Sequence, residues 1–204
     1  MKSIGIVDYG TGNLGSLIAV FESLGVYAEV IGEPKKIARP DVLVLPGVGA
    51  AGMAMKRLES SGMADAIRKR HSAQLPILGI CLGAQLLCGF LREGNCSGFG
   101  WINCDVEPID KYPFFNNGWC QLDFNALKRS GLSRALSSAS TFYFNHRFAM
   151  GRVEKMTCVA VDGRKDIPAI FLDQVICAIQ FHPEKSQRDG RILLRNIFED
   201  YYGL

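Results

Sequence analysis

The sequence has no long apolar run and no excess of one charge. No segment of its 204 residues approaches the ~20 consecutive apolar residues that a membrane-spanning helix needs. The opening MKSIGIVDYGTG reaches Asp8 and a glycine cluster before an apolar stretch of signal-peptide length develops. The 23 basic and 20 acidic residues give a net charge of +3, without a basic stripe. We therefore expect a small-molecule substrate or a protein partner rather than a membrane or nucleic acid.

Metal-binding and disulfide patterns are also missing. The 7 cysteines are odd in number and irregularly spaced, and none forms a C-x-x-C pair. Such cysteine usage is typical of a reduced, cytosolic protein and indicates neither a disulfide framework nor a zinc site. We expect no metal and no cofactor.

The apolar segments predict one α/β domain that covers residues 1–204. Short β-rich runs such as VLVL and PILGI alternate with helical patterns, and this alternation is typical of a doubly wound, mostly parallel sheet of the flavodoxin-like kind. Strands that are apolar throughout indicate helices on both faces. The expected strands are residues 4–8, 26–31, 41–45 and 76–80, and the expected helices are residues 14–24, 53–58 and 63–70.

From about Phe99 the pattern changes to strand after strand. The runs TFYFNH, TCVAVD, PAIFLD and VICAIQF predict an antiparallel layer that extends the parallel sheet. The last element, Arg188 to Tyr201, has apolar residues at helical spacing and is expected to pack on the sheet.

The most informative segment contains Gly79-x-Cys81-x-Gly83 between an apolar strand and a helix. This is the pattern of a nucleophile elbow, with cysteine in place of serine. Glycines two residues on either side are needed because larger side chains would clash at the strained turn. A free cysteine is more often structural, but this local pattern favours a nucleophile.

A cysteine nucleophile needs a base, and the chain has 3 histidines. His182 follows an apolar strand and precedes Glu184, whose carboxylate could orient the ring. His146 lies in TFYFNHRF without a neighbouring acid and is interpreted as a pocket residue, whereas His71 lies in a charged helix end. The sequence therefore predicts a triad of Cys81, His182 and Glu184.

Two backbone segments could stabilise an oxyanion. One is the N–H group of Leu82, directly after the nucleophile. The other is the loop Pro46-Gly47-Val48-Gly49, which ends a strand and should lie at the same carboxyl edge of the sheet. A loop of this composition can equally be an ordinary tight turn.

A second motif suggests a different class of protein. Gly10-Thr11-Gly12-Asn13-Leu14-Gly15 matches the dinucleotide-binding pattern G-x-G-x-x-G. That fingerprint also requires an acid at the end of the second strand, and neither Glu29 nor Glu33 is suitably placed. The nucleotide-binding hypothesis is therefore the weaker one.

Taken together, IVDYGTGN, PGVG, GICLGAQLL and FHPEKS resemble class I, triad-type glutamine amidotransferases over nearly the whole chain. Within that class, the sequence is most similar to the glutaminase subunits of a two-chain synthase of histidine biosynthesis. The resemblance implies that a (β/α)8-barrel synthase chain receives the ammonia. It also implies that Cys81 forms a γ-glutamyl thioester, with His182 as proton shuttle and Glu184 orienting it.

The same resemblance implies further roles. Gly49 and Gln85 would lie against bound glutamine, Glu93 would meet its α-ammonium group, and the Val48–Gly49 peptide would belong to the oxyanion hole. His146 is grouped with the glutamine-binding residues. The expected contacts with the partner chain are Asn13, Trp119 and Lys185.

Positions in two segments depart from the family pattern. Asn116 and Cys120 stand where His and Asn are usual, and Asn145 and Arg147 stand where Val and Ser are usual. In the family these segments lie near the synthase interface, so the partner could instead belong to an amino-sugar or surface-polysaccharide pathway. A stand-alone γ-glutamyl hydrolase or peptidase, and a non-catalytic interaction module, remain alternatives.

Overall fold

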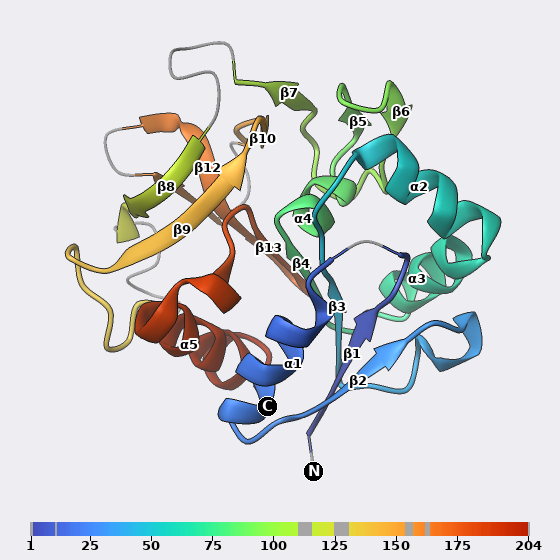
Figure 1. The fold of residues 1–204 in the computed structure, drawn as a ribbon, viewed down its shortest axis with the longest axis horizontal. Coiled ribbons are helices and arrows are strands. Elements are labelled where there is room, and N and C mark those ends of the chain that lie inside the picture. The colour runs from blue at the N-terminus through green and yellow to red at the C-terminus, as the bar shows by residue number, and fades with distance from the viewer. Residues whose placement is uncertain are drawn as a thin grey trace.

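A computed structural model describes residues 2–10, 12–109, 116–124, 131–153, 157–161 and 164–203. Within them the centre of the fold is a seven-stranded sheet of order β11-β12-β13-β4-β3-β1-β2 (Figure 1). The strands from β13 to β2 pair in parallel, whereas β12 and β11 pair antiparallel. This confirms the expected mostly parallel sheet with an antiparallel extension. The strands are β1 (Ser3–Val7), β2 (Tyr27–Ile31), β3 (Val42–Leu45), β4 (Ile77–Ile80), β11 (Thr157–Val161), β12 (Arg164–Asp173) and β13 (Ile176–Ile179).

Helices cover both faces of this sheet, as the apolar strands β3 and β4 require, because all their residues are buried. Phe21 and Leu193 belong to the core on one face, and Leu58 and Ile67 belong to the core on the other. No helix in the described part of the chain is long and apolar enough to cross a membrane. The helices are α1 (Leu14–Ser23), α2 (Ala51–Ser60), α3 (Met63–Ser72), α4 (Leu82–Leu86) and α5 (Gln187–Asn196), with a short 3-10 helix η1 (Pro34–Lys36).

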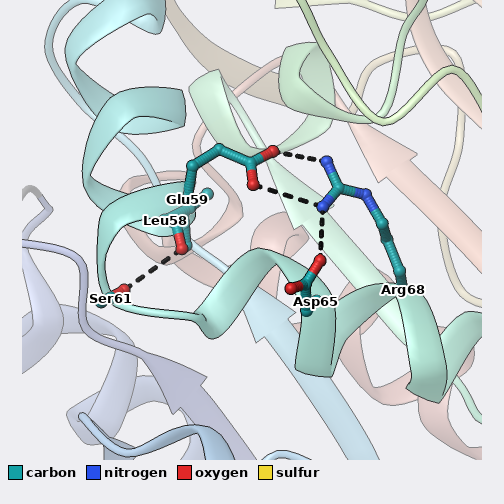
Figure 2. Close-up of polar contacts among 5 residues, drawn as sticks. All are labelled: Leu58, Glu59, Ser61, Asp65 and Arg68. Carbon is teal, nitrogen blue, oxygen red and sulfur yellow. Dashed lines mark hydrogen bonds and ion pairs between the residues drawn. The ribbon is translucent and has the colours of Figure 1, made fainter.

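The turn between α2 and α3 is fixed by polar contacts (Figure 2). Arg68 of α3 forms an ion pair with Glu59 at the end of α2 and another, at 2.9 Å, with Asp65 one turn earlier on α3. The hydroxyl of Ser61 donates to the carbonyl oxygen of Leu58 at 3.2 Å. These contacts hold α2 against its neighbour, and α2 starts directly after the loop that contains Val48.

A buried arginine ties α3 to the sheet. Arg70 is 1% exposed, and its guanidinium donates to the carbonyl oxygens of Ile37, Asp41 and Pro76 over 2.8–3.1 Å. Burial lowers the pKa of Arg70 to about 10, so the side chain is still charged at neutral pH. It therefore supplies several charge-assisted hydrogen bonds to loop carbonyls beside β3 and β4.

The strands after β4 do not all extend the central sheet. The segment TFYFNH forms β9 (Thr141–His146), which pairs with β8 (Asn116–Gln121) in a separate two-stranded sheet. Another small sheet has the order β10-β7-β5-β6. The prediction that this run belongs to the antiparallel extension of the central sheet was therefore wrong for β9, because alternation along a strand does not specify which strand pairs with it. The strands of the small sheet are β5 (Phe90–Leu91), β6 (Cys96–Ser97), β7 (Val106–Pro108) and β10 (Phe148–Met150).

The C-terminal helix packs on the sheet as expected, but it is not uniform. It begins as α5 at Gln187 and changes at Ile197 to a π-helical segment, η4, that ends at Tyr201. The Tyr201 hydroxyl donates to the carbonyl oxygen of Ile176 at 2.9 Å, and that of Tyr202 donates to Ile77 at 2.7 Å. The tyrosines thus fix the starts of β13 and β4, which carry the site at their other ends.

Candidate active site

Cys81 lies at the turn between β4 and α4, with φ +53° and ψ −109°. A side chain rarely adopts this backbone conformation, so the surrounding contacts must enforce it. A Cβ on Gly79 would lie 2.7 Å from Ala84 Cα, and a Cβ on Gly83 would lie 1.8 Å from the Leu45 carbonyl oxygen. The structure confirms the steric reason for both glycines. The Cys81 N–H donates to the Ile179 carbonyl oxygen at 2.7 Å, which fixes the turn against β13.

His182 and Glu184 come together beside this turn. His182 follows β13, and Glu184 lies in the 3-10 helix η3 (Pro183–Lys185). The Nδ1 atom of His182 is 2.9 Å from Oε1 of Glu184, and the two side chains are 2% and 4% exposed. Because Glu184 occupies Nδ1, the Nε2 atom remains for Cys81, with which the ring also forms a hydrogen bond.

The charged form of His182 is favoured in this surrounding. Burial lowers the pKa of His182, but the hydrogen bonds to Cys81 and Glu184 raise it more, and the result is a pKa of about 10. An imidazolium held between a sulfur and a carboxylate can donate a proton to a leaving nitrogen.

The main chain of His182 is tied to β9 by a direct hydrogen bond and through Ser186, a residue that no sequence motif singled out. Ser186 is 1% exposed; its hydroxyl donates to the His182 carbonyl oxygen at 2.6 Å and accepts from the Tyr143 N–H at 2.9 Å. The His182 N–H in turn donates to the Tyr143 carbonyl oxygen at 2.9 Å. Ser186 therefore ties η3 to β9. Its position in FHPEKS was the only available signal.

The loop after β3 packs directly on the nucleophile turn. A Cβ on Gly47 would lie 2.5 Å from Leu82 Cβ and 2.7 Å from the Gly83 nitrogen. Gly49 has φ +111°, and Val48 is 42% exposed. Both segments predicted to stabilise an oxyanion are thus in contact at the carboxyl edge of the sheet.

A pocket of about 190 Å³ opens between these elements. It brings together the predicted nucleophile and base, the predicted oxyanion segments and all four residues expected to contact glutamine. It also includes Asn145 and Arg147, which the resemblance associated with the partner interface. Its lining residues are Val48, Gly49, Cys81, Leu82, Gln85, Glu93, Asn145, His146, Arg147, Phe148 and His182.

The polar side chains of the pocket are held by the surrounding protein. The amide nitrogen of Gln85 donates to the Phe148 carbonyl oxygen at 2.8 Å and to the Gln180 side-chain oxygen at 3.2 Å. Glu93 accepts from the N–H of Ala51 at 2.9 Å, at the start of α2. Gln180 is fully buried, and the only sequence signal for it was a polar residue in the apolar run VICAIQF.

His146 has a different environment from His182. Its Nδ1 atom lies 2.7 Å from the Phe148 carbonyl oxygen and its Nε2 atom lies 3.4 Å from the Asn116 amide nitrogen. A carbonyl acceptor at Nδ1 and an amide donor at Nε2 both fit the neutral ring protonated on Nδ1. His146 is therefore suited to shape the pocket rather than to carry protons.

Two of the residues expected at a partner interface contact Tyr143, whose main chain pairs with that of His182. Trp119 is 48% exposed and stacks edge-on against Tyr143, with ring centroids 5.8 Å apart. The Lys185 ammonium lies 5.8 Å from the Tyr143 ring centroid. Asn13 caps α1 by accepting from the Ser16 N–H at 3.3 Å, and α1 contacts η3. In the part of the chain that the structure describes, no group of three or more His, Cys, Asp or Glu side chains could hold a metal ion.

The fold is that of a glutamine amidotransferase. Residues 5–200 match the family described as "Glutamine amidotransferase class-I", and the chain belongs to that family. A "Crystal structure of glutamine amidotransferase" superposes with a TM-score of 0.77 at 19% identity, covering 98% of this chain and 99% of that one. PurLQS from Thermotoga maritima gives a TM-score of 0.74 at 17% identity, over 97% and 98% of the two chains. At these identities the solved structures share the fold alone.

The curated relatives are more similar in sequence. "Imidazole glycerol phosphate synthase subunit HisH 1" of Campylobacter jejuni subsp. jejuni is 37% identical over 201 residues, which is 95% of this chain and 98% of that protein. "Imidazole glycerol phosphate synthase subunit HisH" of Lactococcus lactis subsp. lactis is 37% identical over 206 residues, covering 98% of this chain and 100% of the relative. The family predicted from the sequence motifs is therefore confirmed.

Proposed function

We propose that this chain is the glutaminase subunit of imidazole glycerol phosphate synthase. It would hydrolyse glutamine to glutamate and ammonia and pass the ammonia to a synthase subunit in histidine biosynthesis. The single observation that carries the proposal is the buried Cys81, His182 and Glu184 cluster at the pocket, in a chain about as long as its HisH relatives.

The first half of the reaction uses Cys81 and His182. The Cys81 sulfur attacks the side-chain carbonyl carbon of glutamine, and the tetrahedral intermediate carries a negative oxygen. Val48, Gly49 and Leu82, which line the pocket together with Cys81, supply the backbone N–H groups that stabilise that oxygen. His182 then protonates the leaving nitrogen, and ammonia departs to leave a γ-glutamyl thioester.

The second half removes the acyl group. His182, now neutral, accepts a proton from water as the water attacks the thioester, and glutamate leaves. Glu184 holds the ring through Nδ1 in both steps, so that Nε2 faces the reacting atoms. Around the substrate, Gly49, Gln85, Glu93 and His146 bind glutamine, with Glu93 meeting the α-ammonium group.

The ammonia acceptor is a separate (β/α)8-barrel synthase subunit, which forms a heterodimer with this chain. Trp119 and Lys185, which both contact Tyr143, and Asn13, at the start of a helix that contacts η3, are the residues proposed to contact that partner. Residues 1–204 act as a single glutaminase domain in the cytoplasm and need no cofactor.

The test is ammonia release from glutamine by the pure chain, alone and with the barrel synthase plus a ligand for its acceptor site. We expect strong stimulation by the partner, since coupling prevents waste of glutamine. The Cys81→Ala variant should lose glutamine-dependent synthesis but retain synthesis from added ammonium. Loss of both activities in this variant, or full activity of the isolated chain, would contradict the proposal; the latter would indicate a stand-alone γ-glutamyl hydrolase.

A second candidate is a paralogous glutaminase that supplies an amino-sugar or surface-polysaccharide synthase. The observation in its favour is the set of departures at Asn116, Cys120, Asn145 and Arg147, three of which contact or line the pocket. The same assay distinguishes the two candidates. No stimulation by the histidine-pathway synthase, with Cys81 still alkylated by a glutamine-like diazoketone, would favour the paralogue.

A further inference from the structure

The pocket wall carries charges of both signs. Glu93 is its only carboxylate and Arg147 is its only guanidinium among the described lining residues. Free glutamine is a zwitterion, and its α-ammonium and α-carboxylate groups lie at the end opposite to the amide that Cys81 attacks. A pocket for glutamine therefore needs a partner for each of these groups, and the proposed function assigns only Glu93.

The main chain of Arg147 is fixed, whereas its side chain is available. Its carbonyl oxygen accepts from the Ile109 N–H at 3.0 Å, and the adjacent Phe148 carbonyl lies 2.7 Å from the His146 ring. The side chain is exposed, and none of the ion pairs between described residues involves it. By contrast, Arg68 and Arg92 each pair with an acid.

We infer that Arg147 is a specificity residue that binds the α-carboxylate of glutamine through its guanidinium. This inference rests on the proposed glutaminase function. A planar guanidinium matches a carboxylate with two parallel hydrogen bonds, which the serine that is usual at this position in the family cannot provide. Arg147 thus contributes to substrate choice rather than to the chemical step.

The experiment compares two substrates that differ only in this group. Ammonia release from glutamine and from 4-aminobutanamide, which is glutamine without its α-carboxylate, is measured for wild type and Arg147→Gln in the presence of the synthase. For glutamine we expect KM to rise about 10- to 100-fold with little change in kcat. For 4-aminobutanamide the variant should equal wild type. Arg147→Lys should recover part of the affinity, and Arg152→Gln, at a nearby exposed arginine outside the pocket, is the control.

Equal losses on both substrates, or no loss on either, would overturn this assignment. A second measurement does not depend on the partner, namely the rate at which Cys81 is modified by a glutamine-like diazoketone and by iodoacetamide, which has no α-carboxylate. Only the first rate should fall in Arg147→Gln. If wild type released no ammonia under any condition, the proposed function would fail instead, so the two failures are distinguishable.

Cys88, two residues after the end of α4, lies close to Cys104. The sulfurs of Cys88 and Cys104 are 3.6 Å apart. Their main chains are also linked, because the N–H of Gly89, the residue after Cys88, donates to the Cys104 carbonyl oxygen at 2.8 Å. To form a disulfide bond of about 2.05 Å, the two sulfurs would have to approach each other by roughly 1.5 Å.

The two thiols differ in access and acidity. Cys88 is fully buried, whereas Cys104 is partly exposed. The hydrogen bond with Cys88 lowers the pKa of the Cys104 thiol more than burial raises it, and the same bond together with burial raises the pKa of Cys88. Cys104 is therefore the thiol that an oxidant in solution reaches first and in its more reactive form.

We propose that Cys104 and Cys88 form a disulfide by exchange with a low-molecular-weight disulfide such as oxidised glutathione. The Cys104 thiolate attacks one sulfur of the reagent and releases one glutathione thiolate. Cys88 then loses its proton, attacks the Cys104 sulfur and releases the second glutathione. Two protein thiols are oxidised and one disulfide is reduced to two thiols.

Intact mass and peptide mapping of the full chain after incubation with oxidised glutathione test this reaction. Wild type should lose two hydrogens and yield a Cys88–Cys104 crosslink. Cys88→Ser should instead retain one glutathione on Cys104, because the resolving thiol is gone, and Cys104→Ser should leave Cys88 unmodified. A stable glutathione adduct on wild-type Cys104, or no modification of Cys104 in Cys88→Ser, would refute the proposal.

Discussion

Replacing Gly83 by alanine should damage the active site more than any other single methyl group added near it. Gly83 lies in α4, two residues after Cys81, and presses against the end of β3. A Cβ at this position would lie 1.8 Å from the carbonyl oxygen of Leu45 and 2.9 Å from that of Pro46. Both obstacles are backbone atoms, so no side-chain rotation can relieve the clash.

The distance by which α4 must move away from β3 sets the size of the expected loss of activity and stability. A carbon and a carbonyl oxygen normally approach no closer than about 3.3 Å, so α4 and β3 must separate by roughly 1.5 Å. A misplacement of about 1 Å costs on the order of 100-fold in rate, and kcat/KM should fall at least that much. Overpacking costs about 1–3 kcal/mol, which corresponds to a decrease in Tm of roughly 5 °C for a chain of this length.

The assay is partner-stimulated ammonia release, together with thermal unfolding followed by circular dichroism. Gly15→Ala is the matched control, because Gly15 also lies in a helix but a Cβ there has no neighbour within 4 Å. This control should gain up to about 1 kcal/mol from helix propensity and keep its activity. A Gly83→Ala variant with wild-type Tm and kcat/KM within about threefold of wild type would refute the steric argument.

Two other substitutions test charged side chains, namely Glu184 at the site and Arg70 in the core. Glu184→Gln should reduce kcat by roughly 100- to 10,000-fold yet remain more active than Cys81→Ala, because it weakens the orientation of His182 without removing the nucleophile. Since Glu184 raises the pKa of His182, the decline of activity at high pH should move to lower pH, and an unchanged pH profile would contradict this. The raised pKa also means that the His182 contribution to stability is complete below its ordinary value of 6.5 and is lost as the pH rises through about 10. Arg70→Met should lower the free energy of unfolding by about 3–5 kcal/mol in urea titration because buried carbonyls lose their donor, whereas the exposed Lys69→Met should change it by less than about 0.5 kcal/mol.

The local chemistry could be predicted from the sequence because it depends on neighbours along the chain. Gly79 marks the strained turn through a local steric demand, because a Cβ there would meet Ala84, whereas the backbone that excludes a Cβ at Gly83 belongs to Leu45 and Pro46, far away along the chain. Glu184 is two residues from His182, so their pairing needed only a short turn. The apolar runs around β3 and β4 likewise report burial on both faces, which is a property of each strand alone.

The sequence was less informative where partners are distant along the chain. The run TFYFNH predicted a strand correctly, but alternation does not specify its neighbour, and β9 pairs with β8 outside the central sheet. Ser186 has no distinctive spacing, yet it joins His182 to Tyr143. The resemblance associated Arg147 with the partner interface, and only the folded arrangement of β9 brings it to the pocket that contains Cys81.

The sequence by itself thus determined the family and the alternating strands and helices of the parallel sheet, and it predicts the nucleophile with its base, since these follow from short motifs and periodic burial. Tertiary structure decided which side chains share the pocket, how deeply the ion pair of His182 and Glu184 is buried, and how close Cys88 lies to Cys104. Those features depend on contacts between segments far apart in the chain. Distances, burial and pKa values arise only when such segments pack together.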